Sequence, residues 1–239
     1  MFVPIYDENP LKGIRFQYAT IALIAINCLV FLVFQLPSLM KADFCSGMMF
    51  ARAFGIVPLE LTGTHVPAPE CADGAIAAVF PEPLTLLTYM FLHGDFWHLL
   101  GNMLFLWVFG DNVEDALGHV RFVIFYLLAG IAGGLLHALM QPYSPAPLIG
   151  ASGAVAGVIA AYLLLHPRVT VWVLVMRFFP LRIPAAFALG AWVLMNLYFA
   201  FVPDQPMVAW WAHIGGLVAG ALLILVMRRP GVPLFDRTA

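Results

Sequence analysis

Charged residues are scarce in this chain. Only 10% of its 239 residues are Asp, Glu, Lys or Arg, whereas 63% are hydrophobic, and the mean hydropathy is +0.94. Water-soluble domains are closer to half apolar and a quarter charged, so this composition excludes that class. The sequence therefore predicts an all-α membrane protein that crosses the bilayer several times.

Cysteines and basic residues are also few, which narrows the possible functions. The three cysteines form no metal-binding or redox motif. Cys28 lies in an apolar run, while Cys45 and Cys71 share one long polar loop, where they could form a disulfide. The net charge of -2 comes without a basic patch, so no nucleic-acid partner is expected. No metal or other cofactor is predicted, and the polar N-terminus predicts no cleavable signal peptide.

Long apolar runs make up most of the chain. About 20 apolar residues cross the hydrocarbon core of a bilayer. By that measure the sequence predicts six spans, at 17–37, 94–112, 121–141, 147–165, 184–203 and 207–227. Two connections are long. The first is the loop 38–92, and the second is 166–183, whose alternating pattern favours an interfacial strand or helix over a seventh span.

The positions of lysine and arginine predict the orientation of the spans. With the N-terminus inside, nine of these residues fall on the inner side, and only Lys41 and Arg52 fall on the outer side. Positively charged loops favour the cytoplasmic side of a membrane. Both termini are therefore predicted to lie inside, with the long first loop outside.

Polar side chains inside apolar spans are costly, so each one is a functional candidate. Ser152 stands among glycines and alanines in the fourth span, and His213 lies in the sixth. His98 and Asn102 are four residues apart in the second span, on one helix face. These three spans run in the same direction, and counting residues puts all four side chains roughly 7–13 Å below the outer helix ends. The shared depth predicts that they meet.

Small residues predict that the fourth and sixth spans approach each other closely. Gly153 and Gly157 have the small-xxx-small spacing in the fourth span, and Gly216 and Gly220 continue one face of the sixth. A close approach of these helices would bring the serine and the histidine within hydrogen-bonding distance.

These groups are suited to hydrolysis by a serine nucleophile. A serine hydroxyl attacks when a base takes its proton, and a histidine is suited to that role. The amide of Asn102, an N–H of His98 and the backbone N–H of Ser152 can donate to the oxyanion of a tetrahedral intermediate. Since no carboxylate is expected at this depth, we predict a Ser152–His213 dyad and not a triad.

The residues resemble the motifs of the rhomboid intramembrane serine proteases. Four stretches carry the resemblance in the family's order: HGDFWHLLGN (93–102), EDALG (114–118), GASG (150–153) and AHIGGLVAG (212–220). The resemblance implies Ser152 as nucleophile, His213 as general base and then acid, and His98 with Asn102 as oxyanion donors.

The resemblance also implies an organisation and a substrate class. A six-helix catalytic domain at 17–227, with its outer loop at 38–92, would lie between cytoplasmic segments at 1–16 and 228–239. The first loop would fold back into the outer leaflet, and the fifth span would border the path of the substrate. The substrates would be single-span membrane proteins cut near the outer face, and membrane lipid would surround the protein in a bacterial inner membrane. The oligomeric state is not predicted.

One position departs from the family pattern. Rhomboids often carry an aromatic residue four positions after the serine, where it can stack on the histidine. That position is Ala156 here, so His213 must be held by other contacts.

Three further polar residues are predicted to be structural. His93 is about 180° around a helix from Asn102, which predicts a loop-to-helix contact. Glu114 lies at the inner end, far from the serine, and is predicted to cap the bundle by hydrogen bonds. His137 is predicted to pack near the outer end of the third span.

Two other functions fit the sequence less well. A catalytically silent or weak rhomboid-like protein, which binds membrane helices for quality control, would lack Ser152 or His213, and both are present. A small transporter would have broken helices or an inverted repeat near the bilayer midplane, and the sequence has neither.

Overall fold

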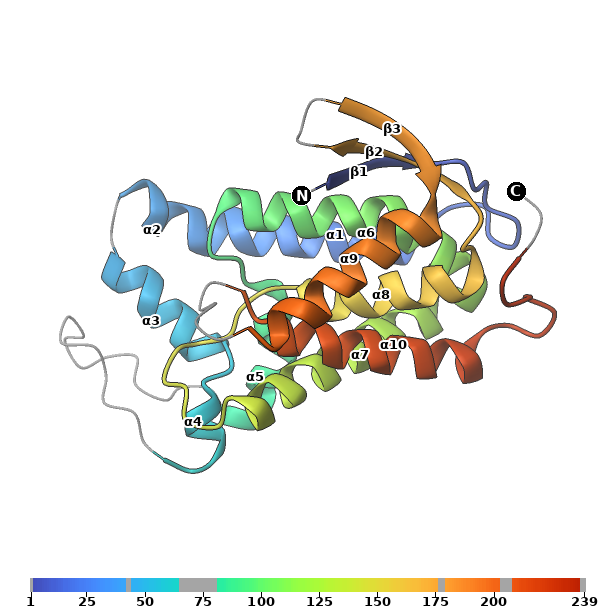
Figure 1. The fold of residues 1–239 in the computed structure, drawn as a ribbon. Helices are drawn as coiled ribbons and strands as arrows, with labels where there is room; N and C mark the ends of the chain where they lie inside the picture. The colour runs from blue at the N-terminus through green and yellow to red at the C-terminus, as the bar shows by residue number, and fades with distance from the viewer. Residues whose placement is uncertain (1, 42–43, 65–80, 176–178, 203–207, 237–239) are drawn as a thin grey trace.

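The computed structural model describes the chain except for residues 1, 42–43, 65–80, 176–178, 203–207 and 237–239. Within the described residues, long helical segments lie side by side and form a bundle (Figure 1). The first segment runs from α1 (Tyr18–Val30) through the π-helical turn η1 (Phe31–Gln35) into α2 (Leu36–Met40). The segments that follow are α6 (Phe96–Leu117), α7 (His119–Met140), α8 (Ser152–Leu165), α9 (Ala185–Ala200) and α10 (Trp210–Met227).

Each predicted span overlaps one of these segments. Three of them, Tyr18–Met40, His119–Met140 and Trp210–Met227, are long and apolar enough to cross a membrane. The apolar helices α8 and α9 are shorter, with 14 and 16 residues, and α6 carries acidic residues in its last two turns. The mostly helical fold is confirmed, while the crossing of the membrane by all six segments stays a prediction.

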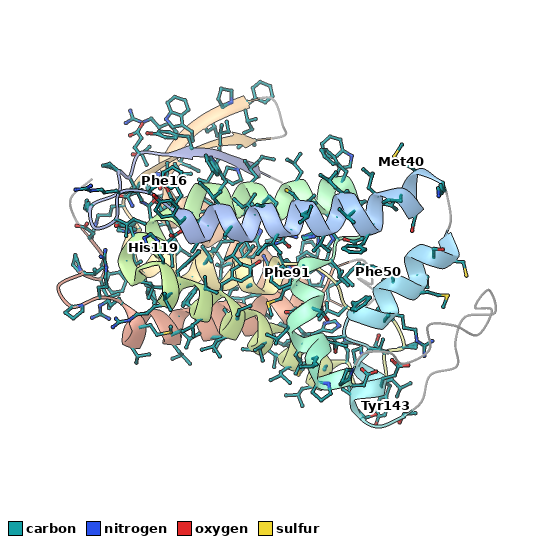
Figure 2. All side chains as sticks on the ribbon, turned by 180° about the vertical axis from the view of Figure 1, so that it is seen from behind. Phe16, Met40, Phe50, Phe91, His119 and Tyr143 are labelled. Atoms are coloured by element: carbon teal, nitrogen blue, oxygen red, sulfur yellow. The ribbon has the colours of Figure 1, made fainter. Side chains whose placement is uncertain are left out.

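The outer surfaces of the long helices are apolar. Leu32, Val120, Leu139 and Val226 point outward and are between 56% and 79% exposed. In Figure 2 side chains project from the outer faces of α1, α2 and α7, with Phe16 and His119 at one end of the bundle and Met40 and Tyr143 toward the other. Lipid tails surround such side chains without the cost that water would impose.

The helix that carries Ser152 is shorter than predicted. We expected the span to begin at residue 147, but α8 begins at Ser152 itself. Pro145 and Pro147 lack the N–H that a helix needs, and Gly150 has φ +128°, so the chain cannot be helical there. The prediction that Ser152 lies about five residues into its helix is therefore wrong. The remainder of α8 is the core of the bundle, and residues 153–162 are all buried.

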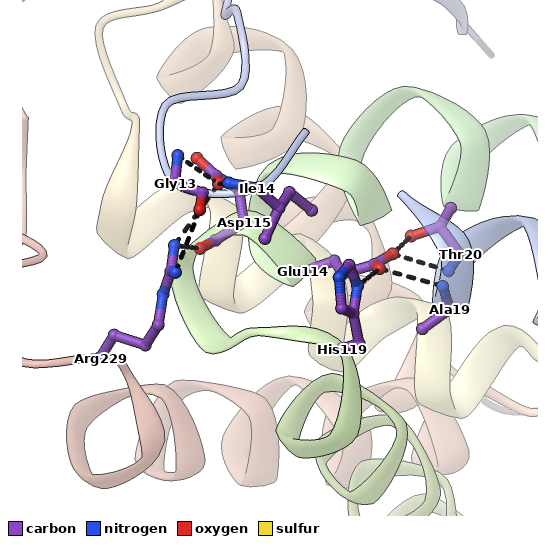
Figure 3. Close-up of polar contacts among 8 residues, drawn as sticks. All are labelled: Gly13, Ile14, Ala19, Thr20, Glu114, Asp115, His119 and Arg229. Carbon is purple, nitrogen blue, oxygen red and sulfur yellow. Dashed lines mark hydrogen bonds and ion pairs between the residues drawn. The ribbon is translucent and has the colours of Figure 1, made fainter. Parts of the chain in front are cut away.

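At the opposite end, α6 extends five residues beyond its predicted limit because its acidic residues have partners there. Glu114 accepts hydrogen bonds from the backbone N–H groups of Ala19 (2.9 Å) and Thr20 (2.7 Å) and from the Thr20 hydroxyl (2.7 Å), and it pairs with His119 (2.5 Å; Figure 3). These bonds satisfy N–H groups at the first turn of α1, which have no partner within the helix. The predicted capping role of Glu114 is confirmed.

The next residue, Asp115, holds the N-terminal segment against this end of the bundle. Its carboxylate accepts hydrogen bonds from the backbone N–H groups of Gly13 (2.7 Å) and Ile14 (2.6 Å), and it pairs with Arg229 (3.5 Å; Figure 3). It also accepts a hydrogen bond from the backbone N–H of Lys12 (2.8 Å). Since Lys12 also pairs with Asp236 (3.1 Å), the N-terminal and C-terminal segments meet at the same end.

A three-stranded antiparallel sheet, with strand order β1-β2-β3, lies near this end (Figure 1). Strands β2 (Thr170–Val175) and β3 (Phe179–Pro184) pair in antiparallel fashion and cover most of the connection 166–183. Of the two predicted forms, strand or helix, the described residues adopt the strand, while the interfacial position stays a prediction. Strand β1 (Phe2–Asp7) was not predicted, because it is defined by pairing with β2 more than 160 residues away. Asp7 at its end is buried and accepts a hydrogen bond from the Tyr162 hydroxyl at 2.5 Å.

The described parts of the long first loop are helical. They form α3 (Phe44–Phe54), α4 (Pro58–Leu61), α5 (Glu82–Thr88) and the 3₁₀ turn η2 (Tyr89–Phe91). Phe50 of α3 stacks on Phe34 at 5.7 Å, and Arg52 forms an ion pair with Glu60. Cys71 lies outside the described residues, so the structure says nothing of its pairing with Cys45.

Candidate active site

Glycines bring α8 and α10 into backbone contact. A methyl group added to Gly216 would overlap the carbonyl oxygen of Gly153, and one added to Gly220 would overlap the backbone of Gly157. The predicted close approach of these two helices is therefore confirmed, and only residues without a side chain permit it at these positions.

The close approach places Ser152 against His213. The distance from Ser152 Oγ to His213 Nε2 is 2.8 Å, which is a hydrogen bond of ordinary length. His213 is 7% exposed, whereas Ser152, as the first residue of α8, is half-buried. The serine is thus hydrogen-bonded to a base and remains partly exposed.

His213 has a second partner that was not predicted from the sequence. Its Nδ1 lies 2.6 Å from Oδ1 of Asn196 on α9, and Asn196 Nδ2 donates to the carbonyl oxygen of Trp192 at 2.7 Å. The serine, the histidine and the asparagine come from three different helices. Asn196 is a polar residue inside the fifth apolar run, and the cost of burying such a residue is the sequence signal that marks it as a candidate.

Aromatic side chains hold the His213 ring in the absence of an aromatic residue at position 156. Trp192 of α9 lies over the ring with centroids 5.7 Å apart and an interplanar angle of 32°, and Trp210 of α10 meets it edge-on at 5.9 Å. Ala156 is fully buried in the contact between α8 and α10. The expectation that other contacts hold His213 is confirmed.

His98, the first predicted oxyanion donor, lies beside the serine. Asp95 caps α6 by accepting a hydrogen bond from the backbone N–H of His98 at 2.8 Å. His98 Nδ1 accepts from the N–H of Gly94 at 3.4 Å, which leaves Nε2 as the nitrogen that carries the proton. A methyl group placed on Gly150 would lie 2.8 Å from His98 Nε2 and 3.8 Å from Ser152 Oγ, so both atoms border the same small space.

Two further donors are close to this space by their place in the fold. Asn102 follows His98 by one helical turn, and its Nδ2 is buried with no hydrogen-bond partner among the described residues. The backbone N–H of Ser152 belongs to the first turn of α8, where N–H groups have no helical partner and the helix dipole favours negative charge. The arrangement therefore offers up to three donors for a developing oxyanion.

His93 and His137 do not belong to the hydrogen-bonded group of Ser152, His213 and Asn196. The backbone of His93 exchanges two hydrogen bonds with the side chain of Gln35, at 2.9 and 2.7 Å, which confirms its predicted loop-to-helix contact. Its ring meets His98 edge-on at 5.1 Å. His137 Nδ1 is buried without a partner in the described part of the chain, and the packing role of His137 stays a prediction.

Comparison with known proteins shows the family to which the chain belongs. The family model for the Rhomboid domain matches residues 81–230, which is more than half of the chain. The chain belongs to the rhomboid family. Together with its apolar helices, this makes the rhomboid an integral membrane protein.

Three relatives illustrate the similarity. The chain is 31% identical over 148 residues to RHOMBOID-like protein 5 of Arabidopsis thaliana, covering 61% of this chain and 44% of that protein. It is 32% identical over 148 residues to Rhomboid protein 1, mitochondrial, of Saccharomyces cerevisiae (58% and 40%), and 32% identical over 152 residues to Rhomboid protease GluP of Bacillus subtilis (64% and 27%). Each match spans less than half of the relative's length.

Proposed function

We propose that this rhomboid is an intramembrane serine endopeptidase in which Ser152 is the nucleophile and His213 the general base. The observation that carries the proposal is the 2.8 Å hydrogen bond between Ser152 Oγ and His213 Nε2, formed by residues 61 positions apart on two apolar helices. Polar side chains inside a membrane bundle are costly and are kept mainly for function.

In the proposed acylation step, Ser152 Oγ attacks the carbonyl carbon of the peptide bond and its proton passes to His213 Nε2. The carbonyl oxygen becomes an oxyanion that accepts hydrogen bonds from His98 Nε2, Asn102 Nδ2 and the backbone N–H of Ser152. When the intermediate collapses, His213 gives its proton to the leaving amine, and the substrate's acyl group stays on the serine.

In the proposed deacylation step, a water molecule takes the place of the amine. His213 accepts a proton from this water as its oxygen attacks the acyl carbon, and then returns the proton to Ser152 Oγ as the carboxylic acid leaves. The step needs no cofactor. It does need water at Ser152, whose position at the first turn of α8 is consistent with access from the nearer membrane surface.

The proposed substrates are single-span membrane proteins, cut near the outer face of a bacterial inner membrane. In this proposal all six helical segments cross the bilayer with both termini in the cytoplasm. The contact of Lys12 with Asp236 supports termini on one common side. Nucleic acid is not among the proposed partners.

The function can be tested with a single-span reporter protein and purified rhomboid in detergent. We expect wild type to cleave the reporter and Ser152→Ala to leave it intact. In cells, membrane-protein fragments released by wild type should be absent with Ser152→Ala. Unchanged cleavage by Ser152→Ala would refute the nucleophile, and a folded but inactive wild type would favour a rhomboid-like protein that binds membrane helices.

A further inference from the structure

Asn196 is a fully buried amide within the apolar helix α9, and both ends of its side chain are bonded. Its exposed fraction is 0%. A buried amide is costly unless its polar atoms have partners. Here Nδ2 bonds to the carbonyl oxygen of Trp192 one turn earlier in the same helix, and Oδ1 bonds to His213 Nδ1 on α10.

The carbonyl oxygen of Trp192 determines which way the amide points. A carbonyl oxygen can only accept a hydrogen bond, so the atom facing it at 2.7 Å must be the NH₂ group of Asn196. The opposite orientation would place two acceptor oxygens against each other. Oδ1 therefore faces His213, and because Oδ1 can only accept, His213 Nδ1 must carry a proton.

This orientation determines the tautomer of His213. A neutral imidazole has one proton, on either Nδ1 or Nε2. With the proton on Nδ1, Nε2 has a free lone pair and accepts from the Ser152 hydroxyl at 2.8 Å. With the proton on Nε2, the lone pair of Nδ1 would face Asn196 Oδ1 at 2.6 Å, and Nε2 could not take the serine proton.

We propose that Asn196 is a positioning residue that keeps His213 in the tautomer able to activate Ser152. This inference rests on the proposed protease function and adds a third residue to it. Asn196 touches neither the serine nor the reacting atoms, and it acts through the histidine. After His213 has accepted the serine proton, the bond to Oδ1 becomes charge-assisted, so the ring keeps its orientation through both steps.

Asn196 connects a third helix, α9, to the proposed base His213. In Figure 1 α9 lies beside α10, and α9 also carries Trp192, whose ring covers His213 at 5.7 Å. Trp192 in turn contacts Phe105 of α6 at 6.1 Å. A displacement of α9 would remove both the Asn196 oxygen that accepts from His213 Nδ1 and the contact of the Trp192 ring with the His213 ring. The orientation of His213 therefore depends on the position of α9.

Three variants separate positioning from folding. Asn196→Leu has a similar volume but no acceptor, whereas Asn196→Asp retains one. The matched control is Asn27→Leu on α1, because Asn27 is also 0% exposed and also donates to the carbonyl one turn earlier, that of Leu23 at 2.8 Å. Reporter cleavage gives kcat and KM, and ¹⁵N NMR of the His213 side chain reports the protonated nitrogen.

We expect Asn196→Leu to lower kcat roughly 10²-fold with little change in KM, within the usual range for loss of acid–base assistance. Asn27→Leu should keep kcat. Asn196→Asp should restore most of kcat and move the acid limb of the kcat/KM profile to higher pH, since a carboxylate favours the protonated ring. The other titratable groups that act on His213, His98 of α6 and His137 of α7, are the same in all variants.

The NMR signal separates this inference from the proposed function. Wild type should be protonated on Nδ1, and Asn196→Leu should shift the proton toward Nε2. Wild-type kcat in Asn196→Leu, or a wild-type His213 protonated on Nε2, would overturn the positioning role. Failure of the protease proposal would instead appear as a wild type without Ser152-dependent cleavage.

Discussion

The contact between α8 and α10 can be tested by adding one methyl group at Gly216. Gly216 lies three residues after His213, and its added methyl would overlap the carbonyl oxygen of Gly153, the residue after Ser152. The helices would have to separate by about 1 Å near Ser152 and His213. Overpacking of this kind costs about 1–3 kcal/mol of stability, and a misplacement of about 1 Å lowers turnover roughly 10²-fold.

The matched control is Gly190→Ala on α9, where the added methyl has no atom within 4 Å. Both variants would be compared in one detergent by thermal unfolding and by the rate of reporter cleavage. Gly216→Ala should unfold at a lower temperature and cleave roughly 10²-fold more slowly than Gly190→Ala. Equal cleavage rates in the two variants would contradict the account of how α8 and α10 bring the dyad together.

Three further predictions concern Asn102, the proposed oxyanion donor, and two acidic residues at or near the end of the bundle where the terminal segments meet. Asn102→Ala should lower kcat by about 10²-fold without lowering the unfolding temperature, and an unchanged kcat would remove Asn102 from the oxyanion site. Glu114→Ala should destabilise the protein by about 3 kcal/mol, since it leaves buried donors of α1 unpaired; thermal unfolding with no loss of stability would refute the capping role. Burial raises the pKa of Asp7 from 3.8 to about 6, against the lowering effect of the hydrogen bond from Tyr162. Because folded Asp7 holds its proton more tightly than the unfolded chain does, its contribution to stability falls as pH rises from about 4 to about 6. Denaturation of both proteins across this pH range should show that the free energy of unfolding falls more steeply with pH in wild type than in Asp7→Asn. Equal slopes for the two proteins would contradict this role of Asp7.

The contact between Ser152 and His213 could be predicted from the sequence because the residues around them carry a strong local pattern. Gly153 and Gly157, matched by Gly216 and Gly220, indicate two helices in close contact, and this contact leaves little freedom for the polar residue that each helix carries. The capping role of Glu114 could also be predicted, because its position beyond the apolar run excluded a catalytic role.

Features that depend on distant contacts were missed. Strand β1 has no strong signal in residues 2–7, and its pairing partner β2 is more than 160 residues away. The start of α8 was misplaced because apolar residues continue upstream of it, although Pro147 and the positive φ of Gly150 exclude a helix there. Asn196 was missed because its role depends on which face of α9 meets His213, and periodicity does not reveal that face in a uniformly apolar helix.

The central claim is that Ser152 is an activated nucleophile. Its most direct test is to treat the folded protein with a fluorophosphonate and to locate the adduct by mass spectrometry of its peptides. We expect one adduct on Ser152, which is lost in Ser152→Ala and His213→Ala. The adduct should persist in Ser144→Ala, whose hydroxyl accepts a hydrogen bond from the backbone N–H of Ala146 in the loop before α8. A folded wild type that is not modified, or labelling that persists in Ser152→Ala, would contradict the claim.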